Sequence, residues 1–344
     1  MKLTRMLLSL VALGLLAGVA YVNQATESTA GKMTGAAEKF LGSLSAEQKT
    51  QAAFAFDDKE RLNWHFVPLE KDKKPARNGL RLELMNADQK AAALDLLKAG
   101  TSMDGFTKAV TIMSLESILL DLEKGSGPTR NPGWYFFAVF GTPSKTGAWG
   151  WRVEGHHLSL NFTLDKGQVV SATPAMFGAN PAVVKGGAKD GLRTLPEAEV
   201  PVKELFGLLS DDEKKVVVQP KAFPEIAGKA AAPKVGDPVG LPGAKMNDKQ
   251  KAALTQIVEG YANRLAPDVA AAYLAEVKQG GGVDKLYFAL SGVPEAGKKY
   301  TYRVQGGTFV IEFLNEQEDS AKNPANHIHS AWRSIKNDFG LASK

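Results

Sequence analysis

Four segments of the chain share one pattern of polar and hydrophobic positions. A small polar residue is followed three positions later by Gln or Glu, and a Leu or Met precedes the motif. In such a capping box the first side chain accepts a hydrogen bond from a free N–H of the first helical turn, and the fourth reaches back to the cap. The pattern therefore predicts four helix starts, at 45–48, 86–89, 210–213 and 247–250.

Helical and alternating stretches follow these starts in the same order twice. The expected helices are 87–100 and 106–122, and then 248–265 and 268–279. After each pair, aromatic and β-branched residues alternate with polar ones, which is typical of strands. The matching strands are 135–143 with 287–294, and 149–162 with 300–313. An Asp-Lys-Gly turn at 165–167 leads into a further strand over 168–173 and predicts an antiparallel hairpin.

This recurrence indicates an internal duplication. Because helices precede antiparallel strands each time, the predicted fold is α+β, with two related halves, each a helix pair followed by antiparallel strands. The halves are expected to span 26–226 and 245–344. The stretch 227–244 between them is rich in Ala, Pro, Gly and Lys, a composition typical of a linker.

Residues 1–25 have the composition of an export signal. Lys2 and Arg5 precede a nearly uninterrupted apolar stretch, and the small residues accepted by signal peptidase follow. We expect cleavage, export to the periplasm or the extracellular space, and no membrane contact in the mature form. The alternative is an uncleaved anchor, although the apolar stretch is short against the ~20 residues of a membrane span.

Composition limits the kinds of functional site and partner that the chain can have. Hydrophobic residues make up 44% of the 344 positions, which is enough for a globular core. There is no cysteine, so disulfides and thiolate metal sites are excluded. The net charge of +5 is spread along the chain. We therefore expect a small-molecule substrate or ligand as partner, and no nucleic acid.

Four of the five histidines lie in two clusters, His156 beside His157 and His327 two positions before His329. Residues two apart in a strand share a face, so His327 and His329 can bind one ion, whereas two neighbours in a regular strand cannot. His-x-His also occurs by chance, and His-His pairs often serve only packing.

Alternation along the predicted strand 149–162 separates two faces. The core-facing set is expected to be Arg152, Glu154, His156, Leu158, Leu160 and Phe162. His157 then lies on the other face, and the corresponding face of the duplicate strand carries Glu312.

The preferred candidate site joins His157, His327 and His329, with His156 as a further candidate metal ligand and Glu312 as ligand or base. Three neutral imidazoles with a carboxylate or water suit a divalent zinc, copper or iron ion. A metal with an open position activates water or polarises a carbonyl. The remaining interpretations are a metal-free polar site and a purely structural role.

Two arginines are candidates for holding a substrate anion. Arg152 or Arg333 can bind a carboxylate or phosphate with two parallel hydrogen bonds. Each can equally pair within the protein, with Glu154 or Asp338.

Over 44–340 the chain resembles the family called domain of unknown function 3500 (DUF3500). The segments that carry the resemblance are long and specific: 61–68, 77–79, 135–143, 149–162, 173–181, 326–333 and 337–340. The resemblance implies no activity, but it marks Gly-His-His and His-x-His as family-defining segments. Two hypotheses follow: a metal-dependent hydrolase or oxidase acting on a small polar substrate, or a non-catalytic envelope protein that binds a ligand or metal.

Overall fold

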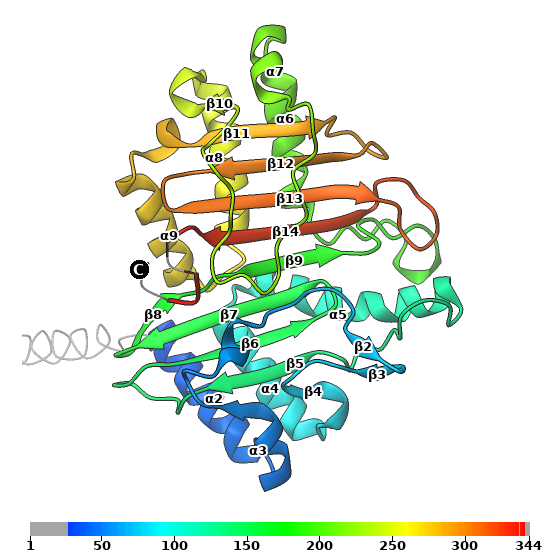
Figure 1. Cartoon of the computed structure of the whole chain (residues 1–344), viewed down its shortest axis with the longest axis vertical. Helices are drawn as coiled ribbons and strands as arrows, with labels where there is room; N and C mark the ends of the chain where they lie inside the picture. Colours follow the sequence, from blue (N-terminus) through cyan, green and yellow to red (C-terminus); the bar gives the residue numbers. More distant parts are fainter. Residues whose placement is uncertain (1–26, 337, 341–344) are drawn as a thin grey trace, which may run out of the picture.

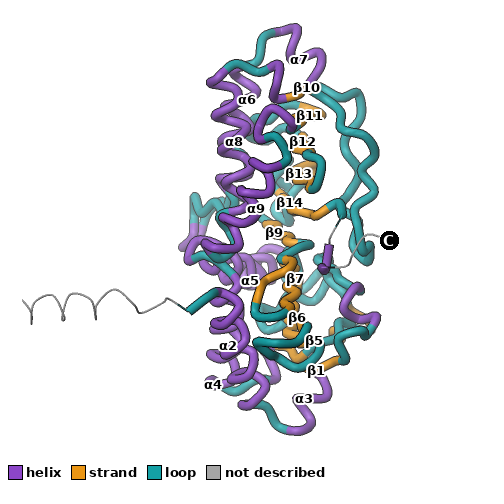
Figure 2. Tube along the Cα trace, turned by 90° about the vertical axis from the view of Figure 1, so that its left-hand side faces the viewer, coloured by secondary structure: helices purple, strands orange, loops and turns teal. Residues whose placement is uncertain are grey.

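One large sheet separates a layer of helices from a layer of irregular segments (Figures 1 and 2). The structure is a computed structural model that describes residues 27–336 and 338–340. The predicted signal at 1–25 lies outside these residues. Within the described chain, no helix combines the length and apolar character that crossing a membrane requires.

The sheet has 12 strands, in the order β1-β5-β6-β7-β9-β14-β13-β12-β11-β10, with β4 on β5 and β8 on β7. Among the named strands of the described chain, β1 alone pairs in parallel, with β5. The strands are β1 (Ala53–Phe54), β4 (Leu80–Arg81), β5 (Phe136–Phe140), β6 (Trp149–Gly155), β7 (Leu158–Asp165), β8 (Gln168–Ser171), β9 (Ala175–Ala179), β10 (Leu241–Pro242), β11 (Tyr287–Gly292), β12 (Tyr300–Gln305), β13 (Phe309–Gln317) and β14 (His327–Ser334). A separate small hairpin pairs β2 (Glu70–Lys71) with β3 (Lys74–Pro75).

Helices cover one face of this sheet, and α3 and α7 lie at its two ends (Figure 2). They are α2 (Thr29–Ser43), α3 (Ala46–Ala52), α4 (Ala87–Gly100), α5 (Met103–Glu123), α6 (Val200–Leu208), α7 (Asp211–Val217), α8 (Asp248–Ala262) and α9 (Pro267–Gln279). All four predicted capping boxes are present, at the starts of α3, α4, α7 and α8. Their polar side chains also meet in pairs: Gln89 donates to Gln48, and Gln250 donates to Glu213.

The predicted α+β class is confirmed. Helices and strands follow in the same order on either side of the central β9–β14 pair, with α2 packed on α4 in one part and α6 on α8 in the other. The common origin of these two parts, as an internal duplication, stays a prediction.

Two segments predicted as single strands are hairpins. Residues 149–162 form β6 and β7, joined by a two-residue turn at His156 and His157, and 300–313 form β12 and the start of β13. The turn reverses the chain, so the core positions change from odd numbers in β6 to even numbers in β7. The expected face was therefore wrong for Arg152 and Glu154. They oppose Asn161 and Ser159 on the face away from the helices.

The face away from the helices is covered by irregular chain. A small apolar cluster there is made of Trp64, Phe66, Met176, Ile226, Leu314, Ala331 and Phe339. The segment 227–244, expected as a linker, crosses this face and hydrogen-bonds to it. The Arg333 guanidinium donates to the carbonyls of Ala227 and Ala230, at 3.2 and 2.9 Å, and Arg303 donates to the carbonyl of Val235.

Candidate metal centre

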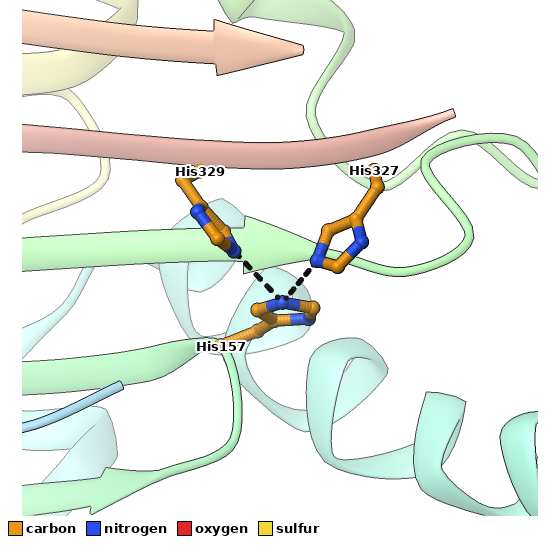
Figure 3. A group of neighbouring side chains, drawn as sticks. All are labelled: His157, His327 and His329. Atoms are coloured by element: carbon orange, nitrogen blue, oxygen red, sulfur yellow. Dashed lines mark hydrogen bonds between the residues drawn. The ribbon is translucent and has the colours of Figure 1, made fainter. Parts of the chain in front are cut away.

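Three imidazole rings converge on the face away from the helices. Nε2 of His157 lies 2.8 Å from Nε2 of His327 and 3.1 Å from Nε2 of His329. One donor nitrogen from each residue lies within 4.8 Å of the others. Figure 3 shows the rings pointing toward one another, two from β14 and one from the turn that ends β6. The structure thus brings together the three histidines that the sequence singled out.

Strand alternation and a tight turn position these rings. His327 and His329 are the first and third residues of β14, and share a face as predicted. His157 has the left-handed backbone torsion φ 62°, and its ring leaves the β6–β7 turn toward β14. Its N–H donates to the carbonyl of Phe66, and its own carbonyl accepts from the N–H of Gly178, both at 2.7 Å.

A glycine leaves room for the ring of His157. A Cβ atom added at Gly178 would lie 3.1 Å from Cδ2 of His157 and 2.7 Å from the carbonyl oxygen of Ile328. Because the carbonyl oxygen of Ile328 belongs to the backbone, a larger residue at position 178 would fit only if β14 or the His157 ring shifted. Close packing of the turn on β9 and β14 therefore requires the absence of a side chain.

Hydrogen bonds among the three rings cannot satisfy all of the converging nitrogens well. Nε2 of a neutral imidazole carries either one hydrogen or one lone pair, so Nε2 of His157 cannot satisfy both neighbours well. A cation between the rings would accept a lone pair from each. Nitrogen ligands ~2.1 Å from one ion lie about 3 to 3.5 Å apart, close to the two contacts in the structure. The geometry fits a single metal ion.

Two of the three imidazoles are buried, and the third is partly exposed. The exposed fraction is 3% for His157 and 6% for His329, whereas His327 is partly exposed. Burial, helped by the neighbouring imidazoles, lowers the pKa of His157 well below its usual range and that of His327 to about 3. Near neutral pH the rings of His157 and His327 are therefore uncharged, the form in which imidazole binds metals.

An outer partner orients one of the rings. Nδ1 of His329, the nitrogen away from the cluster, lies 2.8 Å from Oε2 of Glu225. A carboxylate that accepts from Nδ1–H leaves the lone pair on Nε2, directed at the cluster, as is common for metal-binding histidines. Sequence reasoning missed Glu225 because it lies in an irregular segment without periodicity, and only its carboxylate chemistry could have marked it.

Replacing Glu225 with Ala is expected to lower the affinity for Zn²⁺ about 10- to 100-fold, the usual effect of losing such an outer partner. Chelator competition measures this. The control is Glu318→Ala, because the Glu318 side chain binds Lys322 instead of an imidazole. An equal loss in both variants would mean that local negative charge, and not the contact with His329, is responsible.

His156 lies beside the cluster without joining it. Its ring packs on His157 with 3.8 Å between centroids. Its Nδ1 lies 2.5 Å from Oε1 of Glu116 and 3.1 Å from Nη1 of Arg130. His156 is therefore placed to support the His157 ring and is not among the three converging ligands.

The other candidate side chains are engaged elsewhere. Glu312 pairs with Arg303 at 2.9 Å, directly across from it on β12, and is not part of the histidine group. Arg152 pairs with Glu60 at 2.7 Å and with Glu154 at 3.4 Å. The structure thus does not bring Glu312 or Arg152 to the cluster.

Arg333 is also fully engaged. It pairs with Asp338 at 2.6 Å, and both side chains are completely buried. Its other nitrogens donate to backbone carbonyls, and its guanidinium lies over the ring of Trp64, 4.9 Å from the ring centroid. The internal pairs that the sequence left open for the two arginines are the ones that form, so neither is free to hold a substrate anion.

Comparison with known proteins identifies the family but adds no activity. The family model described as "Protein of unknown function (DUF3500)" matches residues 26–341. No curated protein and no solved structure matches the chain. The match spans nearly the whole chain, including both histidine segments. The protein therefore belongs to the DUF3500 family.

Proposed function

We propose that this protein binds one divalent transition metal through His157, His327 and His329 and acts as a metal-dependent enzyme on a small polar substrate. The observation that carries the proposal is the convergence of three Nε2 atoms from two distant parts of the chain. Three neutral nitrogen ligands suit zinc, copper or iron.

The ligand count favours catalysis. Structural zinc sites usually have four protein ligands, whereas catalytic sites have three and leave a position for water or substrate. Here the group found in the described chain contains three. When bound, such an ion would lower the pKa of a coordinated water or act as a redox centre, which corresponds to a hydrolase or an oxidase. Partly exposed His327 marks the side from which a small molecule could approach.

The burial of the other two imidazoles favours a second candidate. With exposed fractions of 3% and 6% for His157 and His329, access to the ion is restricted. A non-catalytic envelope protein that holds the metal, or a ligand on it, fits this burial equally well.

In both cases we propose export, based on the composition of residues 1–25. Determining the N-terminal residue of the secreted protein tests whether residues 1–25 are removed on export.

Metal analysis of the purified protein tests the site. We expect one zinc, copper or iron ion per chain, and marked loss of the metal in His327→Ala and His329→Ala. His65→Ala is the matched control, because His65 binds Asn63 and lies outside the group. Metal at unit stoichiometry that survives both ligand substitutions would overturn the assignment.

Activity assays separate the two candidates. The metal-loaded protein is tested on ester, peptide and phosphate substrates and in oxidase assays. Turnover that disappears in His327→Ala and His329→Ala, but not in His65→Ala, supports the enzyme. Bound metal without turnover on any of these substrates favours the binding protein.

A further inference from the structure

A buried amide oxygen without a partner lies just after β9, the strand that pairs with β14. Asn180 has an exposed fraction of 4%, and its Oδ1 finds no hydrogen-bond partner within the described chain. Buried polar side chains are nearly always hydrogen-bonded, because leaving one unpaired costs the full free energy of desolvation. A buried amide oxygen without a partner in the protein therefore indicates that a ligand pairs with it.

The β9–β14 pair brings the chain at Asn180 to the end of the sheet strand that carries the histidines. The last paired residue of β9 is Ala179, which lies opposite Ile328. Asn180 follows Ala179, and His327 precedes Ile328. Both residues thus lie at the same end of this strand pair.

The residues of β9 that lead up to Asn180 alternate between the two faces of the sheet. Ala175, Phe177 and Ala179 belong to the core on the helix side. Met176 packs on the opposite side, in the cluster with Phe66 and Ala331, and Gly178 lies under the ring of His157. Asn180 comes two residues further along the chain, directly after the end of β9. The buried amide therefore follows the strand that separates the His157 turn from β14.

We propose that the Asn180 carboxamide hydrogen-bonds the oxygen ligand, water or a substrate oxygen, that occupies the open position of the metal. This inference rests on the function proposed above. An amide oxygen accepts a hydrogen bond from a metal-bound water, and the amide nitrogen donates to a substrate oxygen that replaces it. Such a contact would satisfy Oδ1 only when the centre is loaded, which explains why it lacks a partner within the protein.

Asn180→Ala and Asn161→Ala form a matched pair for testing this. Asn161 is equally buried, at 4%, but its amide donates to Pro174 and Ser159. In the metal-free protein, Asn180→Ala is expected to melt at or above the wild-type temperature, because it removes an unpaired polar group. Asn161→Ala is expected to melt lower, because it breaks satisfied hydrogen bonds.

Loading with Co²⁺, whose visible absorption reports coordination geometry, provides the second measurement. We expect Asn180→Ala to change the Co²⁺ spectrum while affinity stays within about 10-fold of wild type, below the loss expected for a ligand. Asn161→Ala should leave the spectrum unchanged. If Asn180→Ala does not fold, Asn180→Asp retains the shape and should also alter the spectrum.

Each result that differs from these expectations contradicts a specific claim. An unchanged Co²⁺ spectrum in the Asn180 variant, with wild-type metal still held by the histidines, overturns this inference alone. A loss of affinity as large as that of His329→Ala would make Asn180 a metal ligand and also overturn it. Wild-type protein that binds no Co²⁺ overturns both this inference and the proposed function.

Discussion

Replacing His157 with Asn is expected to weaken Zn²⁺ binding about 100- to 1,000-fold. Binding free energies of four-ligand zinc sites, about 10 to 16 kcal/mol, correspond to roughly 2.5 to 4 kcal/mol per ligand, and each 1.4 kcal/mol is tenfold in affinity. His157 contributes the nitrogen that contacts both other rings. Its loss leaves two ligands on one strand, without the third that closes the site.

Asn is chosen because of the backbone at this position. His157 has φ 62°, a left-handed conformation that Asn adopts more readily than most residues. The substitution therefore removes the imidazole while sparing the β6–β7 turn. Chelator competition measures the affinity, and thermal unfolding of the metal-free protein checks that the fold is retained.

The matched control is His156→Asn, in the same turn. His156 pairs with Glu116 and packs on the His157 ring, but it is not part of the group of three converging histidines. We expect at most a tenfold change in affinity there. Equal losses at 156 and 157 would show that the turn, and not the His157 ligand, governs binding, and would contradict the site as described.

Asp338→Ala is expected to lower the free energy of unfolding by about 3 to 5 kcal/mol. The pair with Arg333 is completely buried, with 2.6 Å between Nε and the carboxylate. Burial raises the pKa of Asp338 even though Arg333 opposes this shift. Removing the carboxylate leaves a buried guanidinium charge uncompensated, which is the costly way to break such a pair.

Urea unfolding of two further variants completes this test. Asp212→Ala breaks the exposed Lys215–Asp212 pair, whose side chains are 75% and 90% exposed, and should cost no more than about 1 kcal/mol. The double substitution Arg333→Leu with Asp338→Leu should cost less than Asp338→Ala, because no lone charge remains. A cost below about 1 kcal/mol for Asp338→Ala would show that this carboxylate does not hold Arg333.

Local patterns predicted much of the fold. The capping boxes at Asn86 and Asn247 identify the helix starts because the hydrogen bonds involved span only three residues. The hairpin after β7 was predicted from its turn residues, and it is confirmed. What local patterns could not show was the reversal at His156 and His157. With a two-residue turn, the alternation of hydrophobic and polar residues resembles that of one continuous strand. The turn nevertheless changes which positions face the core.

By itself, the sequence determined the helix starts, the α+β class, the shared face of His327 and His329, and the short set of residue types able to bind a metal. These depend on periodicity and on side-chain chemistry, both of which are local. Only the tertiary structure decided which groups meet. It brought His157 to β14 across the central β9 strand, supplied Glu225 from an irregular segment, and paired Glu312, Arg152 and Arg333 with internal partners. Such contacts depend on strand order and loop path, which involve residues far apart in the chain.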